Sequence, residues 1–365
     1  MEKISMLSTL PPTKGLSPYT LSLVKELSNI VEIEFYGFKS IYPEFLYPGG
    51  TKTNEKEPKI KNVIIKNYMA WYNPLSWVKT GFSIKTKVIH AQWWSWFLAP
   101  QYFIVLSAAK LRRKKIILTI HNVKPHEKSF IKNFLNSSVI NLANEYIVHS
   151  DDNKNLFLKL NKTKKKVHVI PHGVIEMKKP SKSKKELRKQ YNFTDKDKII
   201  LFFGNIRDYK GLDVLLKSFS NIEGAKLIIA GNPWGGFDKY SSLIKQLKIN
   251  DKVTSFLGFN SDKKVAELFT ISDLIVFPYK EFEASSGAGT VALNFEKPLV
   301  VTKVGGLPEL VKDREVIARP NDGRDLEKKI RYALKNLNKL EKEARIKKKE
   351  FSWGKIAEKT VEVYK

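Results

Sequence analysis

A carboxylate, two serines and two glycines lie together in residues 283–291, which read Glu-Ala-Ser-Ser-Gly-Ala-Gly-Thr-Val. An apolar run at 273–278 precedes them, and a short helical pattern leads to a second apolar run at 298–302. Small residues let backbone N–H groups approach a ligand, and a helix start adds partial positive charge. This suits a diphosphate, whereas Glu283 would repel phosphate and is expected to face hydroxyl groups. The stretch suggests a nucleotide sugar, although an ordinary strand–helix turn explains it at least as well.

A second candidate phosphate site is the glycine-flanked loop 204–211, Gly-Asn-Ile-Arg-Asp-Tyr-Lys-Gly, which follows the apolar run 198–203. Arg207 can bind phosphate oxygens through two parallel hydrogen bonds, and Lys210 adds a compact charge. As isolated surface cations they would be unremarkable. Because they lie between a strand end and the helical pattern 212–219, we interpret them as a phosphate clamp.

His121 follows the predicted strand 115–120, and the carboxyl ends of parallel strands are where α/β sheets bind ligands. A histidine satisfied by nearby backbone is the alternative, but the position favours function. His126 could serve either purpose. Residues 93–96, Trp-Trp-Ser-Trp, either pack in a core or form an apolar surface suited to a lipid interface or a sugar ring, and both interpretations stay open.

These residues are positioned by strands and helices that alternate along two halves of the chain. The predicted strands are 4–8, 31–36, 87–90, 115–120, 142–149 and 166–170, then 198–203, 225–231, 253–258, 273–278 and 298–302. A charged helix is expected at 324–349. The alternation predicts an α/β protein with two Rossmann-like, doubly wound domains facing a cleft. We expect the domains at 1–172 and 173–350, with a final helix in 351–365.

The composition restricts the function classes. A chain of 365 residues favours two domains, and the absence of cysteine excludes disulfides and thiolate metal sites. A net charge of +28 implies an anionic partner: nucleic acid, an anionic membrane surface or a phosphorylated substrate. Lysine enrichment also fits a thermophile. The beginning of the sequence has no signal-peptide pattern, and no apolar run is long enough to span a bilayer, so we expect a cytoplasmic protein.

Six motifs in order make the chain similar to the retaining glycosyltransferases of family 4, which have the GT-B fold. They are residues 11–15 (Pro-Pro-Thr-Lys-Gly), 119–122 (Thr-Ile-His-Asn), 170–174 (Ile-Pro-His-Gly-Val), 203–212, 229–231 and 283–309. One such motif would be weak, whereas six in the right order are specific. The similarity covers nearly the whole chain.

The resemblance implies a role for each candidate residue. Arg207 and Lys210 would hold the donor diphosphate, Glu283 the hydroxyls of the donor sugar, and His121 would lie near the reacting sugar. The implied phosphate-side residues also include Gly15, Gly204, Ser286, Gly287 and Ala288. The nucleotide-side residues would be Gly231, Leu257, Gly258 and Val291, and the acceptor-side residues Lys14, Trp93, Trp94 and His126. Val291 stands where the family usually has a second carboxylate, so ribose recognition departs from the family pattern.

The implied activity is transfer of a hexose, with retention, from a UDP- or GDP-linked sugar to a lipid-linked or polysaccharide acceptor. We expect no cofactor and no metal ion, and no specific nucleic acid as a partner. The charge and the tryptophans raise an anionic membrane surface as a further partner. The final helix, with Trp353, would return to brace the first domain. The alternative is a basic protein that binds nucleic acid or a membrane surface and has kept the fold but lost the activity; a phosphorylase or an epimerase of the same fold is less favoured.

Overall fold

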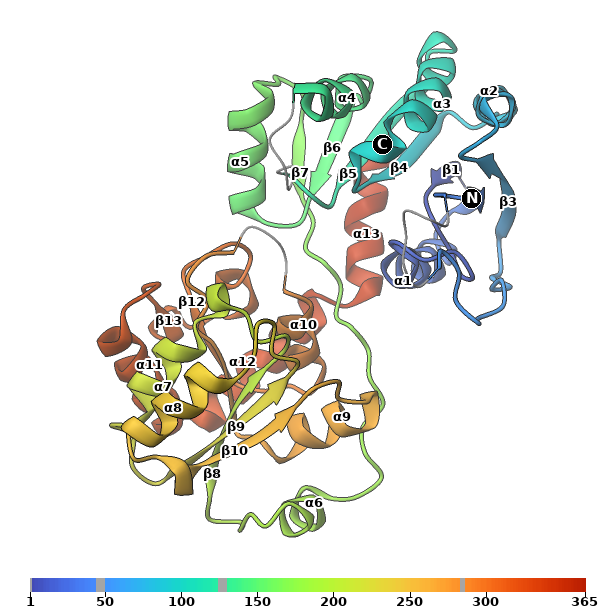
Figure 1. Ribbon diagram of the computed structural model, residues 1–365. Coiled ribbons are helices and arrows are strands. Elements are labelled where there is room, and N and C mark those ends of the chain that lie inside the picture. The colour runs from blue at the N-terminus through green and yellow to red at the C-terminus, as the bar shows by residue number, and fades with distance from the viewer. Residues whose placement is uncertain (1, 44–49, 124–129, 283–285) are drawn as a thin grey trace. The chain divides into compact units, whose positions relative to one another are not determined.

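The computed structural model describes residues 2–43, 50–123, 130–282 and 286–365. The chain forms two compact units (Figure 1). Unit 1 contains Met1–Gly173 together with Trp353–Lys365, and unit 2 contains Val174–Ser352. Both units are α/β structures with parallel sheets, and the predicted two-domain Rossmann-like fold is confirmed.

Unit 1 is built on a seven-stranded sheet in the order β3-β2-β1-β4-β5-β6-β7, in which every pairing is parallel. Its strands are β1 (Lys3–Leu7), β2 (Glu32–Ser40), β3 (Val63–Ala70), β4 (Val88–Trp93), β5 (Lys115–Ile120), β6 (Glu145–Val148) and β7 (Val167–Val169). Its helices are α1 (Ser17–Leu27), α2 (Pro74–Ser83), α3 (Ala99–Leu111), α4 (Phe130–Ile140), α5 (Asp151–Asn161) and α13 (Trp353–Tyr364).

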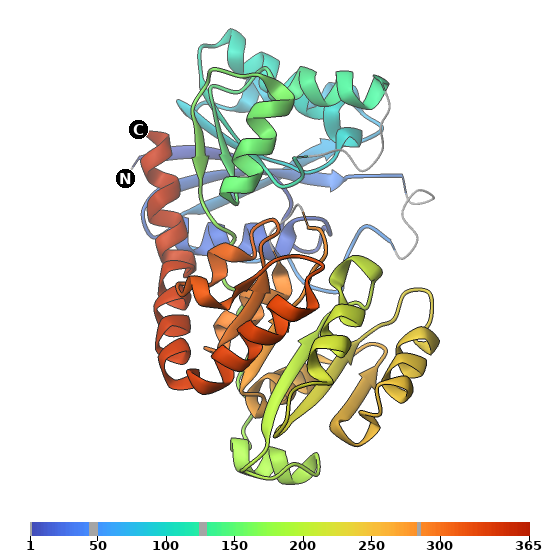
Figure 2. The same cartoon turned by 90° about the vertical axis from the view of Figure 1, so that its left-hand side faces the viewer.

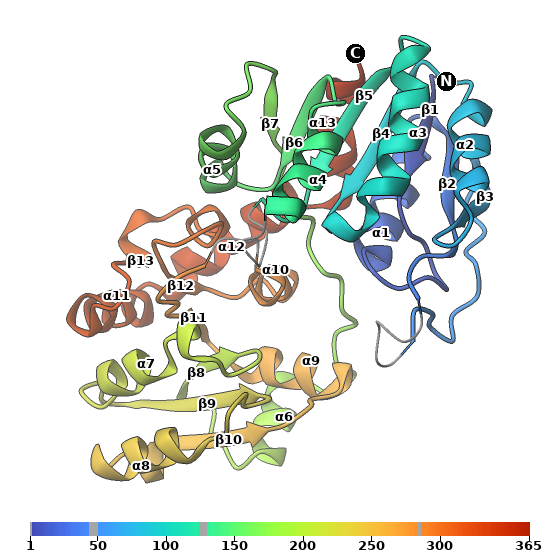
Figure 3. The same cartoon turned by 45° about the horizontal axis from the view of Figure 1, so that its top comes forward.

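The helices of unit 1 cover the two faces of its sheet. Buried side chains of α2, α3, α4 and α5 form one apolar core with the sheet, and those of α1 and α13 form another. Figure 3 shows α3 and α4 in front of β4 and β5. The C-terminal helix α13 packs against α1, as expected, and buries Trp353 and Tyr364. In Figure 2, β1 begins and α13 ends on the same side of unit 1.

Unit 2 has a six-stranded parallel sheet in the order β10-β9-β8-β11-β12-β13. The strands are β8 (Lys198–Phe203), β9 (Ala225–Gly231), β10 (Val253–Leu257), β11 (Leu274–Phe277), β12 (Leu299–Thr302) and β13 (Ile317–Ala318). The helices are α6 (Lys184–Gln190), α7 (Leu212–Phe219), α8 (Asp238–Gln246), α9 (Asp262–Ile271), α10 (Gly287–Asn294), α11 (Gly323–Lys335) and α12 (Leu337–Glu350). Side chains of α6, α9, α10 and α12 pack in one core, and those of α7, α8 and α11 in the other.

The charged segment 324–349 forms two helices and not the single helix that its pattern predicted. The break lies at Asn336, whose backbone leaves the helical region with φ −117° and ψ 22°. The Asn336 side-chain amide donates to the Tyr332 carbonyl at 2.8 Å and its backbone N–H donates to the Ala333 carbonyl at 3.0 Å. These bonds satisfy carbonyls of the last turn of α11, which explains why the helix ends there.

The strand order reverses once in each sheet. β1 lies between β2 and β4 in unit 1, and β8 lies between β9 and β11 in unit 2. At such a point the loops that leave two neighbouring strands turn to opposite faces of the sheet, which opens a crevice for ligands. The loops that follow β1 and β4, and those that follow β8 and β11, are therefore where binding residues are expected.

Candidate functional site

The loop after β8 continues the pairing of β8 with β9 beyond the ends of both strands. The N–H of Gly204 donates to the Ala230 carbonyl at 2.9 Å, and that of Ile206 donates to the Asn232 carbonyl at 2.8 Å. A Cβ at Gly231 would lie 2.0 Å from the Gly204 carbonyl oxygen, so only glycine permits this approach. The loop that carries Arg207 is thus held rigidly at the reversal point of the unit 2 sheet.

Arg207 stacks on Trp234, a residue that sequence reasoning did not assign to the site. The centre of the guanidinium lies 3.8 Å from the centroid of the indole ring, and the Trp234 N–H donates to the Ile206 carbonyl at 3.0 Å. The Nε atom of Arg207 is buried and has no hydrogen-bond partner among the described residues. A buried, unsatisfied cationic donor indicates a place for an anion. The available sequence signal was the Asn-Pro-Trp-Gly-Gly loop at 232–236, which follows the neighbouring strand.

Lys210 lies above the backbone of Gly204 and the ring of Tyr279. A Cβ on Gly204 would be 2.8 Å from the Lys210 ammonium nitrogen, which itself lies 5.1 Å from the centroid of the Tyr279 ring. Burial, and secondarily the charge of Arg207, lower the pKa of Lys210 to about 8. Among the described residues, no carboxylate pairs with Arg207 or Lys210. A bound diphosphate would supply the negative charge that these two cations need.

The loop of the clamp is locked to the segment that follows β11. Gly211 has φ +69°, and a Cβ there would lie 2.0 Å from the Pro278 carbonyl oxygen. The Lys280 N–H donates to the Tyr209 carbonyl at 2.7 Å, and the Lys280 ammonium pairs with Asp213 at 2.9 Å. Because β8 and β11 are neighbours, these contacts fasten together the two loops that leave the reversal point.

The segment after β11 leads to α10, which begins with the small residues of the opening motif. Ser286 caps this helix, since its hydroxyl accepts from the Gly289 N–H at 3.1 Å. A Cβ at Gly289 would meet Leu310 at 2.3 Å, so the glycine allows α10 to pack closely. Gly287 and Ala288 belong to the first turn, whose N–H groups have no acceptor within the helix. This helix start can receive part of an anion. Glu283 lies outside the described residues.

The nucleotide-side candidates lie in different environments. The Gly258 N–H donates to the Gly231 carbonyl at 3.0 Å, which brings Leu257 and Gly258 to the same sheet edge as Gly231. Leu257 is exposed there, and Gly258 has φ +92°. Val291, in contrast, is buried in the core beneath α10 among apolar side chains.

In unit 1, His121 lies at the carboxyl end of β5 and its ring is held from both sides. Its Nε2 is 2.7 Å from Oε1 of Gln92, and its Nδ1 is 3.2 Å from Nε2 of His149. The ring of Tyr19 contacts it edge-on, with centroids 4.7 Å apart. Burial, with smaller contributions from His149, His172 and His90, lowers the pKa of His121 well below its usual range.

The hydrogen bonds around His121 require a definite number of protons. The Nδ1 of His149 must donate to the Ile170 carbonyl at 3.0 Å, and the Nε2 of His121 must donate to the Gln92 oxygen. One more proton must lie between the two rings, so the pair carries three N–H protons, one more than two neutral imidazoles have. If the Gln92 amide turned over, its NH₂ would donate to His121 and both rings would be neutral. Burial lowers the pKa of both histidines, that of His149 to about 4, and so favours the neutral pair with the Gln92 NH₂ facing His121.

A cavity of about 660 Å³ in unit 1 brings several predicted residues together. The residues that line it are Lys14, Gly15, Leu16, Ile41, Tyr42, Thr51, Trp94, Ser95, Phe97, His121 and Asn122. Gly15 has φ +100°, and the Asn122 amide donates to the Trp94 carbonyl at 2.8 Å. The cavity thus brings His121 together with three aromatic side chains, Tyr42, Trp94 and Phe97.

The tryptophans of residues 93–96 divide between core and surface. Trp93 is 1% exposed, packs on Tyr102 and donates from its indole nitrogen to the Asn136 side chain at 2.6 Å. Trp94 lines the cavity, and Trp96 is partly exposed with the Lys132 ammonium 5.0 Å from its ring centroid. The three rings therefore do not form one apolar surface. His126 lies outside the described residues. None of the helices that the structure describes is both long and apolar enough to cross a membrane.

Comparison with known proteins gives matches to two family models. A family model described as glycosyl transferases group 1 matches residues 183–353, and one described as glycosyltransferase family 4 matches residues 15–176. The D-inositol 3-phosphate glycosyltransferase of Mycobacterium marinum is 28% identical over 184 residues, which cover 48% of this chain and 38% of that protein. An uncharacterized glycosyltransferase of Methanocaldococcus jannaschii is 29% identical over 214 residues, 55% of this chain and 54% of that protein.

The alignments with these curated relatives span about half of their length or less. Among solved structures, the complex of Anabaena HepE with UDP has a TM-score of 0.68 and 17% identity, and the match covers 100% of this chain and 99% of that one. At this level of identity the structural match concerns the fold.

Proposed function

Because the chain belongs to the family-4-like group of GT-B glycosyltransferases, we propose that it transfers a hexose from a nucleotide diphosphate sugar to an acceptor. We propose a UDP- or GDP-linked donor, retention at the anomeric carbon, and a lipid-linked or polysaccharide acceptor. The observation that carries the proposal is the pair Arg207 and Lys210 at the reversal point of the unit 2 sheet. Both cations are partly buried, and no carboxylate in the described part of the chain pairs with either.

The chemistry of this transfer requires stabilisation of the leaving group. When the bond between the anomeric carbon and the diphosphate breaks, negative charge grows on the phosphate oxygen. Arg207 can donate two parallel hydrogen bonds to the phosphate. Burial lowers the pKa of Lys210, and an anion beside its ammonium group raises that pKa again, so that the lysine is charged when the diphosphate is bound. The first turn of α10 adds N–H donors. These groups can stabilise the negative charge of the leaving diphosphate, as a metal ion does in other enzymes, so we propose that no metal is needed.

The donor is supported by the fold and by the loops around Gly231. HepE, whose fold is similar, was crystallised with UDP, so a uridine nucleotide is the first donor to test. In this chain, Leu257 and Gly258 lie next to Gly231 at the edge of the sheet that carries the clamp. We propose that this edge receives the nucleoside, with ribose held without the carboxylate that Val291 replaces.

The acceptor proposal depends on the cavity of unit 1. Tyr42, Trp94 and Phe97 offer aromatic surfaces that suit the apolar faces of sugar rings. His121 adds a polar ring in the same cavity, and Lys14 a cation suited to a phosphate on a lipid-linked sugar. These features fit a glycan or a lipid-linked sugar better than a small apolar acceptor.

A thermal-shift panel tests the proposal. Wild type, Arg207→Ala and the exposed control Arg314→Ala would be melted with UDP, GDP, ADP and dTDP and with the matching nucleotide sugars. A ligand at 100 times its Kd stabilises the folded state by about 2.7 kcal/mol, which is a shift of several degrees. We expect one nucleotide to raise the Tm of wild type and Arg314→Ala but not of Arg207→Ala. If no nucleotide raises the Tm of wild type, the proposed donor site is wrong and the alternative of a fold without transferase activity gains support.

A further inference from the structure

The outward face of α2 is apolar, although this helix lies at the surface of unit 1. Trp77, Thr80 and Gly81 are buried on its inner face. The opposite face presents Leu75, which is 79% exposed, Phe82, which is 58% exposed, and Val78 between them. A surface helix ordinarily carries polar residues on that side, because contact between apolar side chains and water is unfavourable in free energy. Leu75, Val78 and Phe82 follow the spacing i, i+3, i+7 and therefore form one stripe.

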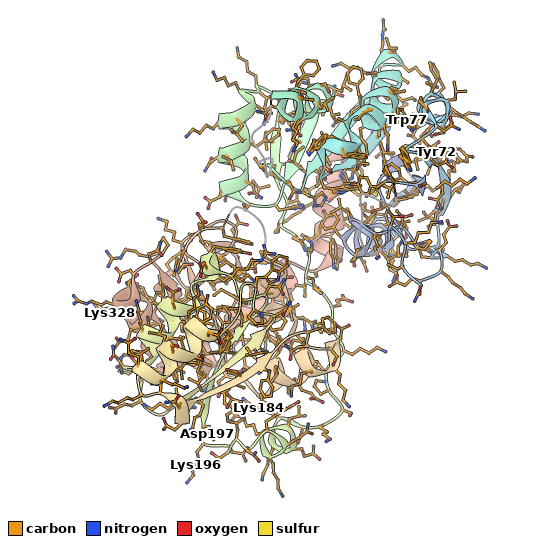
Figure 4. All side chains as sticks on the ribbon, viewed as in Figure 1. Tyr72, Trp77, Lys184, Lys196, Asp197 and Lys328 are labelled. Carbon is orange, nitrogen blue, oxygen red and sulfur yellow. The ribbon has the colours of Figure 1, made fainter. Side chains whose placement is uncertain are left out.

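Neighbouring residues extend this stripe into a patch. Gly81 allows a close approach of α2 to α3, since a Cβ there would lie 2.8 Å from the Ala108 side chain. Leu111 at the end of α3 is 81% exposed. Tyr72 precedes α2 and is exposed, whereas Trp77 is turned into the unit; both are labelled in Figure 4. We call the exposed apolar side chains of residues 72–82 together with Leu111 the α2–α3 patch.

Cations surround the α2–α3 patch, and acidic side chains do not occur in this part of the sequence. Residues 58–123 contain eleven Lys or Arg and no Asp or Glu. The Arg112 guanidinium donates to the carbonyls of Phe82 and Ile84, both at 2.9 Å, so a positive charge is fixed at the end of the apolar stripe. Lys79 lies on α2 next to Val78, Arg113 directly follows Arg112, and both are exposed. The patch therefore combines apolar area with exposed positive charge.

We propose that the α2–α3 patch docks unit 1 onto an anionic lipid bilayer, with Leu75 and Phe82 inserted at the level of the headgroups. Interfacial helices combine an apolar face with flanking Lys and Arg, and bind through both. A second copy of this chain would bring like charges together, and a nucleic acid would leave the aliphatic side chains without a contact. Docking through this patch does not require the transfer reaction, and the lipid contact then lies on α2 and not on the tryptophans of 93–96.

Vesicle sedimentation with the full chain tests the docking. The vesicles would be phosphatidylcholine alone and phosphatidylcholine mixed with phosphatidylglycerol. The proteins would be wild type, Leu75→Ser/Phe82→Ser, Lys79→Glu/Arg113→Glu, and the control Leu160→Ser, which alters an exposed leucine of α5 in the same unit. We expect binding to the anionic vesicles that weakens as salt is raised. Both double variants should lose about tenfold or more of the partition coefficient, and the control should keep it.

The outcomes separate the alternatives. Equal binding to both vesicle types, no binding by wild type, or double variants that bind like wild type would overturn the proposal. A dimer in the absence of vesicles, which Leu75→Ser/Phe82→Ser converts to a monomer, would overturn it in favour of self-association. Because the substituted side chains are exposed, each variant should keep the nucleotide thermal shift of wild type if one is found. A variant that loses lipid binding but keeps the nucleotide-induced rise in Tm is therefore folded. A wild type that binds lipid but shows no rise in Tm with any nucleotide would refute the donor site and leave the docking proposal standing.

Discussion

The depressed pKa of Lys210 predicts that donor binding weakens as the pH rises above about 8. Burial beside Arg207 lowers this pKa from 10.5 to about 8, so the lysine loses its charge in a range where the other site cation, Arg207, keeps its own. A bound diphosphate stabilises the charged form, and so the free protein must take up a proton to bind at high pH. Binding should be independent of pH below the free pKa and should fall above it.

The size of the effect follows from the titration. With a pKa of about 8, the ammonium is about 90% charged at pH 7 and about 9% charged at pH 9. If only the charged form binds the diphosphate, the affinity falls about tenfold over this range, or about 1.4 kcal/mol. The unliganded protein should show the opposite trend in stability: between pH 8 and 10.5 the unfolded chain binds more protons at this site, so this site's contribution to the free energy of unfolding rises with pH.

Isothermal titration calorimetry with the nucleotide sugar found in the thermal-shift panel would measure the affinity at intervals from pH 7 to pH 9. The control is Lys210→Arg, whose guanidinium keeps its charge throughout. The affinity of this variant should stay constant from pH 7 to pH 9, and any change of its affinity with pH reports titration of the ligand. Lys210→Met should bind weakly at every pH.

Two results would refute this reasoning. A wild-type affinity that stays level to pH 9, while Lys210→Met binds poorly, would mean that the lysine contributes its charge but does not titrate in this range. A Lys210→Met variant that binds as tightly as wild type would mean that the lysine does not contact the diphosphate at all.

Three further predictions concern packing and positioning. Gly211 and Gly224 have similar φ values of +69° and +67°, but only at Gly211 would an added Cβ lie 2.0 Å from a backbone oxygen. In urea unfolding we expect Gly224→Ala to lose about 1 kcal/mol of stability and Gly211→Ala to lose at least about 3 kcal/mol. Equal losses would contradict the contact at Gly211. Trp234→Ala should weaken nucleotide binding by about 0.5–2 kcal/mol in calorimetry, because the stacked ring orients Arg207; unchanged binding would remove Trp234 from the site. Gln92→Glu should raise the pKa of the histidine pair behind it, since a carboxylate fixes an acceptor opposite His121; histidine NMR titration that shows no rise would refute the proton accounting.

Local sequence patterns predicted eleven of the thirteen strands that the structure describes and the loop that carries the clamp, but not β3, which is partly exposed, or the two-residue β13. Apolar runs marked the strands because a strand buried on both faces leaves no polar positions, and the loops after them carried Arg207, Lys210 and His121 in the expected places. The order of six motifs identified the family before the sheet order was known. The close approach of Gly231 and Gly211 to backbone carbonyl oxygens, in contrast, emerged only from the structure.

The tertiary structure decided which way side chains point and what they meet. Trp93 and Trp94 are adjacent in the chain and both contact Tyr102, but Trp93 ends β4 inside the core, whereas Trp94 lies beyond the strand and lines the cavity. Trp234 meets Arg207 only because β8 and β9 continue their pairing beyond both strands.

Contacts between distant segments were equally invisible in the local pattern. His149 and Gln92 reach His121 from 28 and 29 residues away, through the parallel neighbours of β5. The stripe of Leu75 and Phe82 reads as an ordinary buried helix face until the packing of α2 shows that Trp77 occupies the inner side. Periodicity reports that a helix has an apolar face, but only the neighbours that cover or leave it determine whether that face is core or surface.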